Sequence, residues 1–86
     1  PIVTDDPVLE EWKEKTERFA KNLDPRLRIH DFRMVPGKHR TNLVFDVLVP
    51  FGYKLSDEDV RKAVRAAVEE RHPDCRCIIQ IDKSYT

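Results

Sequence analysis

The segment NLVFDVLVP, residues 42–50, constrains the fold of this 86-residue chain more than any other stretch. Apolar side chains occupy its alternate positions, namely Leu43, Phe45, Val47 and Val49. A period of two is the pattern of a strand that buries one of its faces. We therefore predict a strand here, with these four side chains turned toward a core.

The segment before it has the period of a helix followed by a second strand. Apolar and small side chains recur at helical spacing from Pro7 to Leu23, and Asp6 with Pro7 suits a cap and first turn. The expected buried stripe is Val8, Trp12, Thr16, Phe19 and Leu23. Residues 26–35 are predicted to form a strand, which a turn at 36–40 joins to residues 42–50 as a hairpin.

The segment after it repeats the pattern once more. The residues from Ser56 to Asp59 resemble a capping box, and an apolar stripe follows until Pro73 stops the helix: Val60, Ala63, Val64, Ala67 and Val68. A last strand is predicted from Cys75 to Asp82. The right-handed crossover rule favours a last strand parallel to the second, and leaves its neighbour in the sheet open.

The order α-β-β-α-β makes one α+β domain over residues 1–86, with an open three-stranded sheet and both helices on one face. Two helices leave the other face of the sheet bare. That face is expected to carry apolar side chains around polar ones: Val44, Leu48 and Ile78 with Asp46, Gln80 and Asp82. A half-apolar open face predicts a partner.

Composition limits the classes of partner. Sixteen basic residues balance sixteen acidic ones, and a neutral chain without a basic stripe argues against nucleic acid or an anionic membrane as the main partner. No apolar run is long enough to span a bilayer. Because the chain begins with Pro1, we expect it to be part of a longer protein. Cys75 and Cys77 are too close for an ordinary disulfide, which indicates a reducing, cytosolic compartment.

The chain contains none of the short motifs of nucleophilic, nucleotide-binding or CxxC chemistry, and we expect no enzyme. It does contain scattered nitrogen and oxygen donors that are candidate metal ligands: His30, Asp46, Glu58, Gln80 and Asp82. Imidazole and carboxylate suit zinc, manganese, iron or cobalt. The alternative is that these are ordinary surface charges, because no two of them form a local signature.

The motifs IHDFR, a turn containing Gly37, NLVFDVLVP and IIQID, in this order and spacing, resemble the cytoplasmic C-terminal domain of the cation diffusion facilitator transporters. The resemblance covers nearly the whole chain. It implies a metallochaperone-like, ferredoxin-like fold that forms a homodimer at the cytoplasmic face of the cell membrane, below a transmembrane domain of the same chain. It also implies a regulatory role, in which bound metal is coupled to cation efflux.

The resemblance further implies metal ligands at His30, Asp46, Glu58, Gln80 and Asp82, at and near the dimer interface. Three of these positions are often histidine in the family, and here they are Asp46, Glu58 and Gln80. An oxygen-rich site, less selective for zinc, is therefore expected. Zinc is the first expectation, with manganese, iron, cobalt and cadmium as alternatives.

Two interpretations of His30 stay open. As a ligand it would have Asp31 to orient it, whereas the plainer interpretation is a half-buried structural histidine. Strand alternation puts His30 on one face with Phe32 and Met34. Either those two side chains belong to a partner interface, or a bulge shifts the register.

Two further sets of donors stand outside this group. The cluster His72, Asp74, Cys75 and Cys77 would suit zinc, cadmium or copper, or else is a turn entering an edge strand with Cys77 packed and Cys75 exposed. His39, between Lys38 and Arg40, is expected in solvent. Alternative functions are a stand-alone metallochaperone-like protein, a dimerisation module without metal, an RNA-binding sheet and a small hydrolase.

Overall fold

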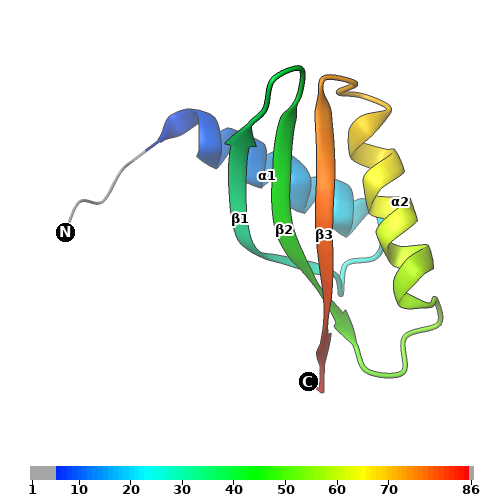
Figure 1. Cartoon of the computed structure of the whole chain (residues 1–86). Helices are drawn as coiled ribbons and strands as arrows, with labels where there is room; N and C mark the ends of the chain where they lie inside the picture. The colour runs from blue at the N-terminus through cyan, green and yellow to red at the C-terminus, as the bar shows by residue number, and fades with distance from the viewer. Residues whose placement is uncertain (1–5, 86) are drawn as a thin grey trace.

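Five elements follow one another in the predicted order (Figure 1). The computed structural model describes residues 6–85, and its elements are helix α1 (Pro7–Leu23), strand β1 (Arg28–Pro36), strand β2 (Thr41–Pro50), helix α2 (Asp57–Glu69) and strand β3 (Cys75–Ser84). The α+β class and the α-β-β-α-β order are thus confirmed. Helix α2 ends at Glu69, before the predicted stop at Pro73.

Both helices begin at the capping residues that the sequence indicates. The side chain of Asp6 accepts hydrogen bonds from the backbone N–H groups of Val8 (3.0 Å) and Leu9 (3.4 Å). The hydroxyl of Ser56 accepts one from the N–H of Asp59 (3.1 Å). These bonds satisfy donors that have no partner inside the first turn of a helix, so local chemistry fixes where each helix starts.

The three strands lie in the order β1-β2-β3. Strand β1 is antiparallel to β2, and β3 is parallel to β2, as the crossover rule predicted. The position of β3 beside β2 was left open by the sequence. Because β2 is the middle strand, its outward-facing side chains lie between those of β1 and β3. Residues from all three strands therefore form the open face.

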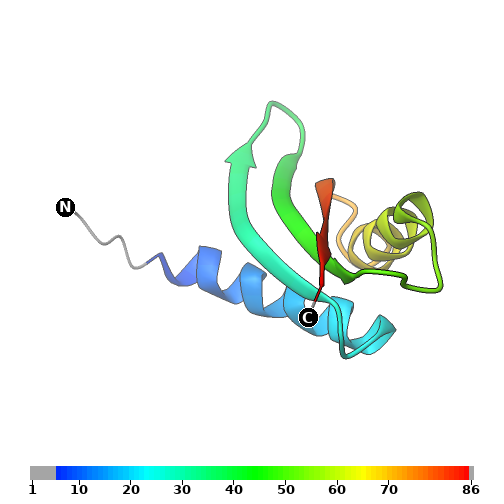
Figure 2. The ribbon, with the colours of Figure 1, turned by 90° about the horizontal axis from the view of Figure 1, so that it is seen from below.

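The core lies between one face of this sheet and the two helices. In Figure 1, α1 passes behind the strands and α2 lies beside β3, and Figure 2 shows β1 and β2 strongly curved. The alternate side chains of β2 predicted to face the core are all buried: Leu43, Phe45, Val47 and Val49. They meet Val60, Val64 and Val68 of α2 and Ala20 of α1 in one cluster.

The predicted stripe of α1 is correct in its middle and wrong at its ends. Thr16 is buried and donates a hydrogen bond from its hydroxyl to the carbonyl of Trp12 (2.8 Å). Val8 and Leu23, in contrast, are 57% and 44% exposed. In Figure 1, α1 crosses behind the strands, and its N-terminal turn extends past β1. Within residues 6–85, no helix is both long and apolar enough to cross a membrane.

Candidate functional site

The sheet register places three of the five candidate ligands in one row across the open face. His30 of β1 is opposite Asp46 of β2, and Asp46 is opposite Gln80 of β3. Asp82 lies one row further along, opposite Leu48. Four side chains from three strands, far apart in the sequence, therefore share one side of the sheet, the side that neither helix covers.

A bulge at Asp31 explains how His30 reaches this face. The register of β1 on β2 shifts between His30 and Arg33, and Asp31 has a φ angle of 54°, in the left-handed region. Short polar side chains such as aspartate tolerate this conformation better than most. The extra residue reverses the alternation, so His30 is exposed while Phe32 is buried and stacks on Phe45 with ring centroids 5.7 Å apart.

The bulge, and not a partner interface, accounts for the positions of Phe32 and Met34. Phe32 belongs to the core, and Met34 packs against that core. Neither side chain is on the face of His30. The open face keeps its apolar character through other residues: Val44 and Leu48 are partly buried, and Ile78 is 48% exposed. Apolar and ligand-type side chains are thus interleaved, as the sequence pattern predicts.

Asp46 is the electrostatic centre of the face. Its pKa is raised, first by partial burial, then by the charge of Asp82 and by its contact with Asp31. Like charges held close together disfavour ionisation because each carboxylate raises the energy of the others. Asp31, which the sequence suggested only as an orienting neighbour of His30, is therefore a direct neighbour of Asp46. The two line one shallow depression together with Phe32, Arg33 and Gln80.

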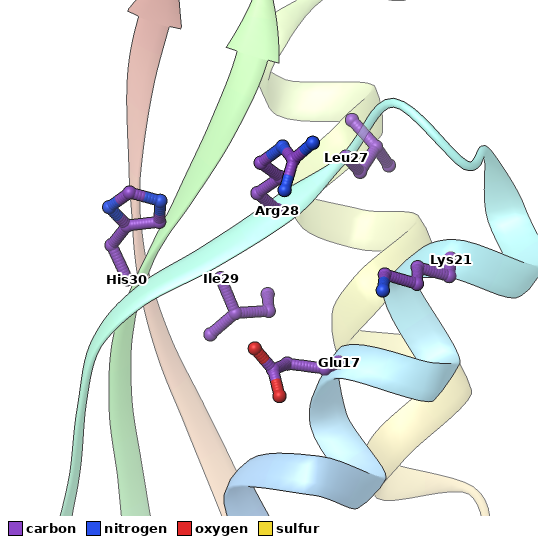
Figure 3. Close-up of a pocket in the computed structure, with 6 residues that line it drawn as sticks. All are labelled: Glu17, Lys21, Leu27, Arg28, Ile29 and His30. Atoms are coloured by element: carbon purple, nitrogen blue, oxygen red, sulfur yellow. The ribbon is translucent and has the colours of Figure 1, made fainter.

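The other side of His30 borders α1. A small hollow of about 110 Å³ lies between α1 and β1 and is lined by Glu17, Lys21, Leu27, Arg28, Ile29 and His30. Figure 3 shows Ile29 pointing toward the helix and the carboxylate of Glu17, whereas the side chains of Arg28 and His30 stand on the opposite side of the strand. The His30 ring is thus directed to the open face and is not enclosed as a core histidine.

Glu58 stands apart from the other four candidates. It lies in the first turn of α2, where its carboxylate forms an ion pair with Arg61 (2.7 Å). Arg61 in turn donates a hydrogen bond to the carbonyl of Ile79 (3.1 Å), which holds the pair beside β3. Because α2 packs on the helix-covered side of the sheet, a role for Glu58 at the open face requires a second copy of the chain.

The donors of one copy are too few to enclose a cation. Among residues 6–85, no three His, Cys, Asp or Glu side chains are arranged to hold a metal ion. Asp46 interacts with both Asp31 and Asp82. What the face supplies is an imidazole, carboxylates and an amide in two adjacent rows, which is a suitable donor chemistry but an incomplete coordination shell.

The second candidate cluster is not assembled as a metal site. Cys75 and Cys77 are both buried, including Cys75, which the plainer interpretation placed in solvent. Burial, followed by the charge of Glu69, raises the pKa of Cys77 to about 12, and burial also raises that of Cys75. Both thiols are buried in the core cluster, where they pack as small apolar side chains do. The His72 ring meets Trp12 edge-on at 4.6 Å.

One buried carboxylate was missed by sequence reasoning altogether. Asp24, just after α1, accepts hydrogen bonds from the backbone N–H of Arg26 (2.8 Å), from its Nε (3.2 Å) and Nη2 (3.0 Å), and from the Tyr53 hydroxyl (2.9 Å). Hydrogen bonds from Arg26 hold the pKa of Asp24 far below its usual range. Its partner Tyr53 lies 29 residues further along the chain, so no local pattern indicates this bond.

Comparison of the chain with models of protein families, with curated proteins and with solved structures gives no match.

Proposed function

We propose that this chain is the cytoplasmic, metal-responsive dimerisation domain of a divalent-cation efflux transporter of the cation diffusion facilitator type, and not an enzyme. The observation that carries the proposal is the row formed by His30, Asp46 and Gln80 on the uncovered face of the sheet. The α-β-β-α-β order supports it as well. The proposal places the homodimer at the cytoplasmic face of the membrane, attached to a transmembrane domain of the same chain.

The need for a second copy follows from the incomplete donor set. A two-fold axis at the open face would present every donor twice, which turns two or three ligands into a full shell. The same contact would cover Val44, Leu48 and Ile78, whose exposure costs free energy in a single copy. Glu58 lies on the helix-covered side of the sheet, so a contact between two open faces does not by itself bring Glu58 to this site; it would join only if the second copy also reached the start of α2.

The physical mechanism is a reversal of charge repulsion. In the absence of metal, Asp46 and Asp82 repel each other, as the raised pKa of Asp46 reflects, and a second copy adds further carboxylates. A divalent cation between them converts this repulsion into attraction and favours a tighter dimer. The cation shifts the equilibrium only by its difference in affinity for the two arrangements. Protons and the cation compete for the same ligand atoms, so affinity is expected to increase with pH.

The donor types narrow the range of metals. One imidazole with several carboxylates and an amide oxygen suits zinc and also the harder manganese, iron and cobalt ions, and it discriminates among them weakly. The buried, protonated thiols of Cys75 and Cys77 give no soft site, which makes cadmium the least favoured of the five. Zinc and manganese are therefore the two ions to compare first.

Isothermal titration calorimetry with zinc chloride and manganese chloride tests this function. We expect the wild-type chain to bind, with higher affinity at neutral than at acid pH. His30→Ala and Asp46→Ala should each weaken binding by at least about tenfold. The matched controls, His39→Ala in the hairpin and Glu11→Ala on α1, remove the same types of side chain from exposed positions and should bind as the wild type does.

Three results would contradict the proposal in different ways. Absence of binding by the wild type at any pH would leave a dimerisation module without metal. Binding by a chain that stays monomeric at all concentrations would instead favour a stand-alone metallochaperone-like protein. Equal losses in the variants and their controls would show that the metal binds elsewhere.

A further inference from the structure

A shallow, open depression lies at the hairpin end of the sheet, in the turn between β1 and β2. A hollow of about 340 Å³ is lined there by Gly37, Lys38, His39, Arg40, Asn42 and Arg76. Three of these side chains are permanently charged, all three are positive, and no carboxylate is among the lining residues. For a chain with a net charge of zero, this is a local concentration of positive charge.

These cations have no partner of their own. Within residues 6–85 the four ion pairs of the protein involve Arg26, Arg61, Arg65 and Lys83, and none involves Lys38, Arg40 or Arg76. All three side chains are exposed. Placing three unpaired positive charges around one hollow costs electrostatic free energy that an anion in the hollow would recover.

The backbone that carries these side chains is held in a defined shape. The N–H of Gly37 donates a hydrogen bond to the carbonyl of Arg40 (2.8 Å), and a Cβ at Gly37 would lie only 2.6 Å from that oxygen. Glycine is thus required for the turn to close. The N–H of Thr41 donates to the carbonyl of Asp74 (3.0 Å), which ties the hairpin to the start of β3. Arg76 is therefore fixed next to the turn, directly opposite Asn42.

We infer that this hollow is a binding site for a phosphate group. Two guanidinium groups and an ammonium group match phosphate in charge, and arginine offers paired N–H donors that fit two phosphate oxygens at once. His39 and the amide of Asn42 supply further donors at the rim. The phosphate comes either from a small soluble compound or from an anionic lipid headgroup. This inference does not depend on the proposed metal site, since it uses none of the same residues.

The test has two arms, which distinguish the sources of phosphate. In the first, sodium pyrophosphate is titrated into the 15N-labelled protein, and the amide shifts of residues 37–42 and of Arg76 are followed by NMR. In the second, the protein is sedimented with phosphatidylcholine vesicles that do or do not contain phosphatidylserine. Pyrophosphate shifts confined to the hairpin identify a soluble ligand, whereas sedimentation only with phosphatidylserine identifies a lipid headgroup.

Charge variants decide whether the hollow is responsible. Arg40→Gln and Arg76→Gln should each weaken binding about tenfold, and Arg40→Lys, which keeps the charge but loses the paired donors, should have an intermediate effect. Arg18→Gln and Lys62→Gln make the same change of charge on the exposed surfaces of α1 and α2 and should have no effect. All four substituted side chains are exposed, so far-ultraviolet circular dichroism should confirm an unchanged fold for each variant.

Three outcomes would overturn the inference. The first is that neither millimolar pyrophosphate nor phosphatidylserine vesicles bind the wild type. The second is that Arg40→Gln and Arg76→Gln bind as well as the wild type. The third is that Arg18→Gln and Lys62→Gln weaken binding as much as the hairpin variants do, which would mean that the net charge alone is responsible.

Discussion

Asp24 and Asp46 are two aspartates with opposite surroundings. Asp24 accepts two hydrogen bonds from the Arg26 side chain, one from its backbone and one from Tyr53, and its pKa is far below the usual range. Asp46 faces Asp31 and Asp82, and its pKa is raised. The protein supplies every partner that the first carboxylate needs, and it gives the second mainly other acids.

The difference separates a structural carboxylate from an available one. The partners of Asp24 tie the end of α1 to the loop after β2, and its lone pairs are engaged, so it has nothing to offer a ligand. Asp46 keeps its lone pairs and is destabilised as an anion, which a cation would relieve. The sign of the pKa shift, together with the identity of the neighbours, therefore points to the open face as the functional region.

Removing the structural carboxylate should have the largest effect. Asp24→Asn is expected to lower the thermal unfolding midpoint by on the order of 10 °C, because it breaks the ion pair with Arg26 and weakens the bond from Tyr53. Differential scanning calorimetry at neutral pH measures this change in the unfolding midpoint. The folded-state pKa of Asp24 is lowered, so its contribution is full above the ordinary aspartate pKa and is lost as pH falls toward the folded value. The gap between the two melting curves should narrow in acid.

Relieving the backbone at the bulge should have the next largest effect, with the opposite sign. Asp31→Gly is expected to raise the free energy of unfolding by about 1 kcal/mol, because glycine adopts a positive φ without the steric penalty and one acid leaves the cluster. Urea denaturation measures this change. Asp74→Gly, a change to glycine in an exposed turn, is the control and should not stabilise. Destabilisation by Asp31→Gly would mean that its side chain holds the bulge.

Neutralising the available carboxylate should stabilise the fold slightly. Asp46→Asn is expected to raise the unfolding midpoint by about 1–3 °C at pH 7, since the amide can donate to Asp31 or Asp82. The folded pKa of Asp46 is raised, so its ionisation penalty is absent below the ordinary aspartate pKa and is complete above the folded value. The advantage of the variant should therefore disappear in acid. A lower midpoint at pH 7 would contradict the account of this cluster.

The smallest effect is expected at Glu58. Glu58→Gln removes one exposed ion pair with Arg61 and should change the free energy of unfolding by less than about 1 kcal/mol. Its metal affinity at concentrations where the chain is monomeric should equal that of the wild type. A difference that appears only in the dimer would show that Glu58 reaches the site of the second copy. A loss in the monomer would instead place Glu58 near Asp46 in solution.

The elements of the fold could be predicted from the sequence because each depends on local pattern. The alternation of Leu43 to Val49 and the caps at Asp6 and Ser56 are properties of neighbouring residues. The position of β3 beside β2 depends instead on packing between distant segments, and periodicity carries no information about it. The predicted buried stripe of α1 was too long for the same reason. Val8 is apolar and stands at the correct helical spacing, but its side chain is 57% exposed.

The candidate site was predictable in its residue types and less so in its geometry. Alternation along β2 and β3 correctly put Asp46 and Gln80 on the open face. The bulge at Asp31 was one of two alternatives from the sequence, because the pairing of two strands determines where a bulge forms. Aspartate at that position is compatible with the positive φ. The bond between Tyr53 and Asp24 spans 29 residues, beyond the reach of any local pattern.

Sedimentation velocity in the presence of chelator, and then of zinc or manganese, shows whether metal binding controls the dimer of this chain. The account predicts a dimer that becomes more compact when metal is added. It also predicts that His30→Ala and Asp46→Ala do not become more compact, while His39→Ala behaves as the wild type. If no metal changes the sedimentation coefficient, and calorimetric titration with metal releases no heat of binding, the proposed metal-responsive dimer is contradicted. His30 is then a structural residue.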